Sequence, residues 1–321
     1  MILGNFIFNY VVNRVLAENH PTKDYDRCIN RRQVKHICTV CQEVCPVHVY
    51  SGPGGKKADF TECMNCNLCV TACPARCIAS SAMNVSSYLK LLRIPEGAIY
   101  IASRQYERTA HLRVDYFAAL SWEYLACIGL RKKVVFLTDA MPDITLQAEE
   151  VWQKTLANLK FFFGNKEFDK RFLFSEKLQL EDSQQISRRE LFKKANEELK
   201  SKISSFVPSE SMMDGLLYRY LLKETLIEMG SKDSFGWVVP IITSKCKGCN
   251  VCSSLCPQNA ITVKKDNGQF RLFFYPFRCN HCGLCQKVCI RHAVNGFGLS
   301  HINNLKPMLL FDSAVDGGDN P

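Results

Sequence analysis

The sequence lacks any apolar run approaching the roughly 18 residues that a membrane-spanning helix needs. Its first twenty residues, MILGNFIFNYVVNRVLAENH, contain neither the basic start nor the small-residue cleavage site of a secretory signal. These absences argue against an integral membrane protein and against export by the general secretory route. We therefore expect a cytoplasmic protein, in a compartment that keeps thiols reduced.

Glycine is scarce where a nucleotide-binding site would need it. The turns after the predicted strands 98–102 and 133–137 read Ser-Arg-Gln-Tyr and Thr-Asp-Ala-Met-Pro, without the glycines that let a phosphate approach the backbone. The seven histidines form no HxxxH pair, and no general base or activated nucleophile is evident. We expect no substrate chemistry from the chain alone. A flavin or nucleotide bound in this segment is the enzymatic alternative.

Cysteine, in contrast, is abundant, with 18 residues in 321. Sixteen of them form four short groups, two in residues 28–73 and two in residues 246–289. The groups are Cys28…Cys38-x2-Cys41-x3-Cys45, Cys63-x2-Cys66-x2-Cys69-x3-Cys73, Cys246-x2-Cys249-x2-Cys252-x3-Cys256 and Cys279-x2-Cys282-x2-Cys285-x3-Cys289. A proline follows the last cysteine of every group except the fourth, where Ile290 stands instead. Thiolates at this spacing hold cubane iron–sulfur clusters in bacterial ferredoxins.

Both cysteine-rich regions resemble the bacterial-type two-cluster 4Fe-4S ferredoxin family, and the whole chain resembles a tandem polyferredoxin with a small α/β insert. In that family the fourth cysteine of each group ligates the neighbouring cluster. The resemblance therefore implies four [4Fe-4S] clusters. Their ligands would be Cys28, Cys38, Cys41 and Cys73 for cluster 1; Cys45, Cys63, Cys66 and Cys69 for cluster 2; Cys246, Cys249, Cys252 and Cys289 for cluster 3; and Cys256, Cys279, Cys282 and Cys285 for cluster 4.

Several alternatives stay open at the cysteines. Cys28 is separated from Cys38 by a stretched loop, and if it did not reach the cluster, His36 could replace it or a three-iron cluster could form. A single CxxC pair also suits structural zinc, and cysteine-rich chains can form disulfides. The fourfold recurrence of one spacing favours iron–sulfur clusters over both. We expect Cys77 and Cys127 to pack in the core.

The interval between the two cysteine-rich regions has a different periodicity. We expect strands at 98–102, 133–137 and 171–174 to alternate with helices at 116–130, 146–163 and 188–206, which gives a small βαβαβα domain with a short parallel sheet. The predicted fold class is thus α+β, with two βαββαβ ferredoxin-like units flanking this domain. The predicted segments are an N-terminal helix in 1–22, the first ferredoxin-like domain in 23–82, the insert in 83–208, a helical linker in 209–236 with its helix at 212–229, the second ferredoxin-like domain in 237–300 and a tail in 301–321.

The formal net charge of +10 does not indicate nucleic-acid binding. Sixteen thiolates and four iron–sulfur cores would together add a charge of about −8, so most of the basic excess would be offset. Basic residues are also not interleaved with aromatics along one face, as a nucleic-acid site would require.

We therefore expect an electron-transfer protein or subunit of an anaerobic organism. It would relay single electrons from a ferredoxin, hydrogenase or formate dehydrogenase type of donor to a catalytic oxidoreductase subunit. Arg31, Arg32 and Lys35 near cluster 1, compared with the Phe-rich segment 270–277 near clusters 3 and 4, predict a higher potential in the N-terminal half. An iron–sulfur redox sensor is the third alternative.

Overall fold

The computed structural model describes residues 20–32, 38–79, 91, 94, 97–103, 110–138, 145–176, 214–228, 235–302 and 307–315. The helix predicted at 188–206 lies outside these residues, as do residues 1–19 of the predicted N-terminal helical segment and His36; Thr22, at the end of that segment, begins strand β1. Within the described part, no helix is both long and apolar enough to cross a membrane.

A four-stranded parallel sheet lies in the segment between the two cysteine-rich regions. Its strands are β5 (Ile99–Ser103), β6 (Leu112–Val114), β7 (Val134–Leu137) and β8 (Phe172–Ser175), in the order β6-β5-β7-β8. Ile99, Ile101 and Phe136 are fully buried, as expected of β-branched and aromatic side chains in a central strand. The three predicted strands and their parallel pairing are confirmed. Strand β6 was not predicted, because three residues with a single buried side chain show no recognisable period.

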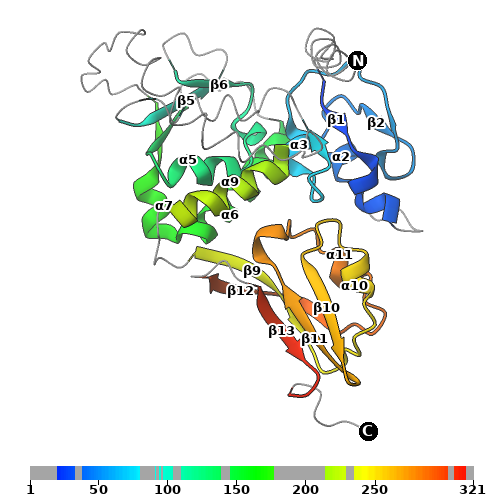
Figure 1. Cartoon of the computed structure of the whole chain (residues 1–321). Coiled ribbons are helices and arrows are strands. Elements are labelled where there is room, and N and C mark those ends of the chain that lie inside the picture. The colour runs from blue at the N-terminus through cyan, green and yellow to red at the C-terminus, as the bar shows by residue number, and fades with distance from the viewer. Residues whose placement is uncertain are drawn as a thin grey trace, which may run out of the picture.

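Four helices lie beside this sheet: α5 (Trp122–Gly129), α6 (Leu146–Phe163), α7 (Asn165–Arg171) and α9 (Asp214–Glu228). Figure 1 shows α5, α6 and α9 packed beside one another below it. Helix α6 begins where the Thr145 side chain accepts the N–H of Ala148 at 3.2 Å, and it ends at Gly164, whose φ of 78° is accessible to glycine. The predicted helix at 146–163 is confirmed, and the one at 212–229 is confirmed within two residues.

The continuous helix predicted at 116–130 is wrong. A 3-10 turn, η4 (Phe117–Ala119), comes first, and the chain is then extended at Leu120 and Ser121. Because the Ser121 hydroxyl accepts the N–H of Tyr124 at 3.2 Å, Ser121 is the N-cap of a new helix, α5. The apolar residues on both sides of this break are buried, so hydrophobicity alone could not reveal it.

The first cysteine-rich region contains short elements joined by longer loops. They are β1 (Thr22–Lys23), η1 (Tyr25–Arg27), η2 (Ile29–Arg32), α2 (Val40–Glu43), β2 (Tyr50–Ser51), η3 (Pro53–Gly55), β3 (Lys57–Ala58), α3 (Leu68–Ala72) and β4 (Ile78–Ala79). Strands β1 and β4 pair antiparallel, and so do β2 and β3. Each pair is only two residues long, so the buried cysteines and the loops between them form most of this region's interior.

The second cysteine-rich region has the same order of helices and strands with longer strands. Its elements are β9 (Phe235–Ile242), α10 (Val251–Ser254), β10 (Ile261–Asp266), β11 (Gln269–Phe274), η5 (Pro276–Arg278), α11 (Leu284–Lys287), β12 (Val294–Ile302) and β13 (Met308–Asp312). Strands β10 and β11 form a hairpin that turns at Asn267 and Gly268, both with positive φ, as a two-residue hairpin loop requires. Part of the predicted tail, residues 308–312, forms β13 and pairs with β11.

The two cysteine-rich regions meet around α6 and α9. In Figure 1 the second region lies below these helices; β9 contacts α6, and η5 contacts α9. Phe235 stacks on Phe162 with ring centroids 4.7 Å apart, and Trp237 lies 6.2 Å from Trp122. Gly236 passes so close to α6 that a Cβ added there would come within 2.1 Å of the Phe161 carbonyl oxygen. One buried core therefore extends through both cysteine-rich regions and the insert.

Candidate metal centre

Three of the cysteine groups share an unusual loop conformation around the second cysteine. The residues immediately before and after that cysteine have positive φ, with values of 56° and 60° at Asn65 and Asn67, 61° and 69° at Gly248 and Asn250, and 55° and 69° at His281 and Gly283. For residues other than glycine, this left-handed conformation costs about 1–2 kcal/mol each. It turns backbone N–H groups toward sulfur, as where His281 N–H lies 3.4 Å from Cys279 Sγ. Such strain is typical of functional loops.

All four groups share a second local structure after the fourth cysteine. The residue three positions later has positive φ and donates its N–H to the carbonyl of that cysteine; the residues are His48, Arg76, Asn259 and His292, at 3.2, 3.1, 3.2 and 3.0 Å. In three groups the next N–H is directed at the sulfur itself, from Val49 to Cys45 at 3.4 Å, from Ala260 to Cys256 at 3.2 Å and from Ala293 to Cys289 at 3.2 Å.

Three cavities are each lined by one complete predicted ligand set. Site 1 (Cys28, Cys38, Cys41, Cys73) surrounds about 290 Å³, site 3 (Cys246, Cys249, Cys252, Cys289) about 420 Å³ and site 4 (Cys256, Cys279, Cys282, Cys285) about 380 Å³, open solvent included. The remaining set is site 2 (Cys45, Cys63, Cys66, Cys69). There the charges of the other three thiols each act to raise the pKa of Cys69, so the four sulfurs lie near one another. In every set the structure thus brings the fourth cysteine of one group to the first three of another.

The donor set and the shape of these sites fit an iron–sulfur core. Zinc would hold four sulfurs about 2.3 Å from a single point, whereas here the sulfurs line a cavity. Burial raises the pKa of Cys279 and of Cys69 to about 12, and that of Cys252 to about 11. Without a cation these thiols would be protonated, so a cationic metal core is what would ionise them.

Site 1 includes Cys28 in spite of the stretched loop. Cys28 ends the turn η1 and is buried. Asn30 connects the two sides of the loop, because its side-chain amide donates to the Cys38 carbonyl at 2.7 Å and its side-chain oxygen accepts the Cys38 N–H at 3.0 Å. Gly54 lies directly against Asn30, where a Cβ would come within 2.3 Å of the amide nitrogen. This bridge positions Cys38 beside Cys28 without the usual two-residue spacing.

Two further side chains contact the sulfurs of site 1. The Lys23 ammonium donates to Cys41 Sγ at 3.4 Å and to the Gly55 carbonyl at 2.9 Å. Cys77 lines the same cavity, with its Sγ 3.5 Å from Cys73 Sγ. Hydrogen bonding from Cys77 lowers the pKa of both Cys28 and Cys73. Cys77 is buried as predicted, but it is also a fifth thiol in the site.

Some predicted neighbours of the sites have other roles. Arg31 is exposed and pairs with Asp26 at 2.8 Å, so part of the positive charge expected near cluster 1 is neutralised; Lys35 lies outside the described residues. In the second region the Phe270 ring packs against Gly248, which could not carry a Cβ there. Cys127 is fully buried in α5, as predicted.

The sites follow one another through direct contacts. The Tyr50 hydroxyl reaches Cys69 of site 2 at 3.8 Å, and the charge of Cys41 in site 1 acts on the same phenol. The Ala75 carbonyl, in the wall of site 1, accepts from Gln258 at 3.2 Å and from Asn280 at 3.3 Å, both in the wall of site 4.

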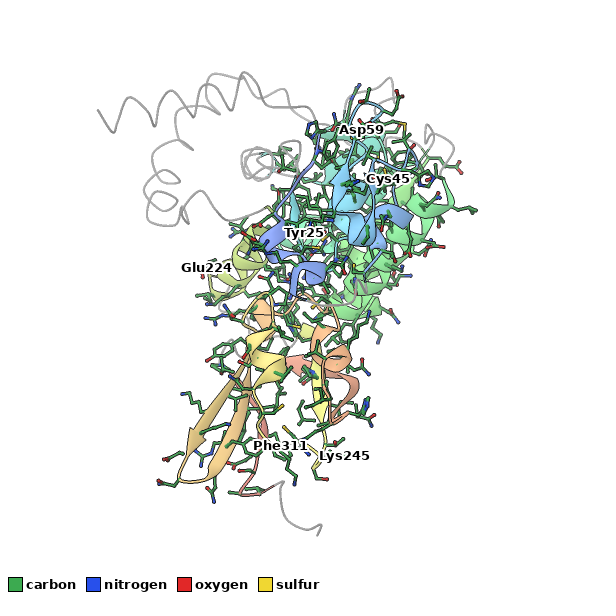
Figure 2. The ribbon with its side chains drawn as sticks, turned by 90° about the vertical axis from the view of Figure 1, so that its right-hand side faces the viewer. Tyr25, Cys45, Asp59, Glu224, Lys245 and Phe311 are labelled. Carbon is green, nitrogen blue, oxygen red and sulfur yellow. The ribbon has the colours of Figure 1, made fainter. Side chains whose placement is uncertain are left out.

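Helices α10 and α11 pack together. Helix α10 carries Cys252 of site 3, and α11 carries Cys285 of site 4. In Figure 2, Cys45, Tyr25 and Lys245 follow one another from the top to the bottom of the molecule. Cys45 belongs to site 2, Tyr25 adjoins site 1, and Lys245 precedes Cys246 of site 3. Since site 4 contacts site 1 through the Ala75 carbonyl, the sites follow one another along the length of the molecule in the order 2, 1, 4, 3.

The turns after β5 and β7, in which a flavin or nucleotide would bind, include residues 104–109 and 139–144, which lie outside the described part of the chain. That alternative stays a prediction without a structural test.

Comparison with known proteins adds one finding. A family model described as a 4Fe-4S dicluster domain matches residues 245–293, a stretch that contains all eight cysteines of sites 3 and 4. This indicates that the second cysteine-rich region binds [4Fe-4S] clusters and suggests an iron–sulfur electron-transfer role. No curated protein and no solved structure matches the chain.

Proposed function

We propose that this chain is an electron-transfer protein that binds four [4Fe-4S] clusters, one at each of sites 1 to 4. The observation that carries the proposal is that three complete cysteine sets, those of sites 1, 3 and 4, each line a separate cavity and each combine cysteines of two groups. When bound, such a cluster accepts and releases one electron at a time. The family match covers only sites 3 and 4, so sites 1 and 2 rest on their cysteines and on the shared structure after the fourth cysteine.

The tandem arrangement of two ferredoxin-like units is part of this proposal. Its support is the order strand-helix-strand-strand-helix-strand, which occurs in residues 22–79 and again in residues 235–302. Both units place the last cysteine of a group within two residues of the end of its short helix, as in α3 before Cys73. A helix of four or five residues is long enough to separate this cysteine from the first three and to direct it to the neighbouring site.

The protein's own residues would hold the clusters and exclude water. Backbone N–H groups and the Lys23 ammonium would stabilise negative charge on the sulfurs, while the buried side chains of Ile78 at site 1 and Leu284 at site 4 would exclude water. The order of sites 2, 1, 4 and 3 supports a relay along the molecule. Cys249 at site 3 is exposed, which makes that site the more accessible end for a redox partner.

The expected partners are redox proteins: a donor of ferredoxin, hydrogenase or formate dehydrogenase type and a catalytic oxidoreductase subunit. A cytoplasmic location in an anaerobic organism agrees with clusters of this kind. The chain itself would supply electron transfer rather than substrate chemistry.

Anaerobic redox titration of the purified chain tests this function. Stepwise reduction should bleach the visible absorption and produce the EPR signals of reduced [4Fe-4S] clusters, and reoxidation should restore the absorption. Clusters that are present but stay oxidised at potentials as low as dithionite reaches would refute the relay and would leave them a structural role.

A further inference from the structure

A buried network of three charged side chains lies where the two cysteine-rich regions meet. Arg76 follows the fourth cysteine of its group, Glu123 lies on α5 and Arg219 lies on α9. Arg76 Nη2 donates to both Glu123 carboxylate oxygens, at 3.0 and 2.9 Å, and Arg219 Nε lies 3.3 Å from one of them. The side chains of Glu123 and Arg219 are each only 1% exposed.

This network carries a net positive charge that water cannot screen. Two guanidinium groups share one carboxylate, and the Arg219 guanidinium lies 5.4 Å from the centroids of both the Trp122 and the Trp237 rings. A buried charge without a compensating partner is strongly unfavourable. The excess charge therefore requires an anion nearby.

Sites 1 and 4 adjoin this network, and their cysteines would supply negative charge when ionised. Arg219 donates to the carbonyls of Pro276 and of Cys279, a site 4 cysteine. Arg76 is three residues from Cys73 of site 1 and donates to its carbonyl through the backbone. The same junction contains the hydrogen bonds from Gln258 and Asn280 to the Ala75 carbonyl. The network thus connects the walls of both inner sites.

We propose that Arg76, Glu123 and Arg219 are positioning residues whose net positive charge favours reduction of the clusters at the two inner sites, 1 and 4, over those at the outer sites, 2 and 3. This inference rests on the proposed electron-transfer function. A positive charge fixed in a poorly solvated place stabilises an added electron nearby, and it stabilises the electron less as distance grows. The junction between the two regions would then be where an electron resides during transfer.

Variants that change the charge of the network in opposite directions distinguish this role from a purely structural one, because only an electrostatic role shifts the cluster potentials in opposite directions. Glu123→Gln raises the network charge from +1 to +2, Arg219→Gln lowers it to zero, and the double variant returns it to +1. The matched control is Glu224→Gln, the same substitution on α9 at a half-buried side chain that Figure 2 labels at the edge of the molecule.

Potentiometric EPR, with iron counted in each sample, provides the readout. We expect E123Q to raise the equilibrium constant for reducing a subset of the clusters about tenfold, or 59 mV for one electron, and R219Q to lower it by a similar factor. The double variant and E224Q should titrate like the wild type, and the remaining clusters should not shift. If iron content is retained but the single variants leave all potentials unchanged, or shift them in the same direction, the inference is overturned.

Two further results keep this inference testable. If a single variant does not fold, the double variant becomes the background, because it keeps the network at its original charge of +1, with Arg76 as the remaining charge and its donor to the Thr71 carbonyl still in place. Adding Arg76→Gln to it takes the network from +1 to zero and must lower the same potentials. If the wild type has reducible clusters but this step has no effect, only the inference fails. If the wild type has no reducible clusters, the proposed function itself fails.

Discussion

Lys23 offers the most direct test of how the protein tunes one site. Its ammonium is half-buried, donates to Cys41 Sγ at 3.4 Å and lies over the rings of Tyr25 and Tyr50 at 5.1 and 5.3 Å. Burial acts to lower the pKa of Lys23, but the negative charges of Cys41 and Cys28 outweigh it, and the pKa is raised. Lys23 therefore stays protonated at neutral pH. The substitution Lys23→Gln removes a full charge from site 1 and keeps a hydrogen-bond donor.

The size of the effect follows from Coulomb's law. Two unit charges 3.4 Å apart interact by about 5 kcal/mol at an effective dielectric constant of 20, and by about 1.2 kcal/mol in water. The electron added on reduction is spread over the cluster, farther from Lys23 than the Cys41 sulfur is, and the ammonium is partly solvated. We therefore expect the interaction energy between Lys23 and the added electron to lie near the lower limit, at about 1.4 kcal/mol. This corresponds to a factor of ten in the equilibrium constant for reduction, or 59 mV for one electron.

Potentiometric EPR of the K23Q variant measures this shift. One cluster should become harder to reduce, with a midpoint lower by about 59 mV, because the lost positive charge had favoured reduction. The control is Lys57→Gln in the same region, where the lysine is exposed on β3. A midpoint that is unchanged or higher in K23Q, with iron content intact, would refute the assignment of Lys23 to the electrostatics of site 1.

Three other predictions concern the sites and the core. Cys77→Ala should keep the full iron content, whereas Cys73→Ala should lose iron from site 1; equal losses in the two variants would make Cys77 a ligand. Gly236→Ala should lower the free energy of unfolding by about 2 kcal/mol in urea titrations, since its Cβ would clash with the Phe161 carbonyl, and an unchanged midpoint would contradict this packing. Removing iron with a chelator should abolish amide protection in residues 20–32 and 38–79, where the strand pairs are two residues long, while β5 and β7 stay protected. Protection in the first region that survives iron loss would show that its fold does not depend on clusters.

Local patterns predicted much of the fold. The predicted bounds of the helix at 146–163 agree with the structure, where Thr145 caps the helix and Gly164 ends it. The ligand sets that the ferredoxin resemblance implies stay a prediction, and the cysteines of three of them line one cavity each. In contrast, the break at Ser121 lies inside a continuous apolar stretch and depends on a cap that periodicity does not reveal.

Features that depend on distant parts of the chain were missed. The Lys23 contact with Cys41 forms because β1 pairs with β4, which brings residue 23 beside the loop of site 1. Arg219 and Glu123 are 96 residues apart in sequence, and nothing near either one signals a buried ion pair. Strand β13 is similar: it lies in the predicted tail and exists because β11 has a free edge for it.

The most direct test of the central claim is the amount of iron and acid-labile sulfide in anaerobically purified protein. Four cubane clusters require about sixteen atoms of each per chain, and we expect values close to this, together with a brown colour. About eight of each would show that only the region matched by the 4Fe-4S dicluster domain holds clusters, and would contradict the assignment of sites 1 and 2.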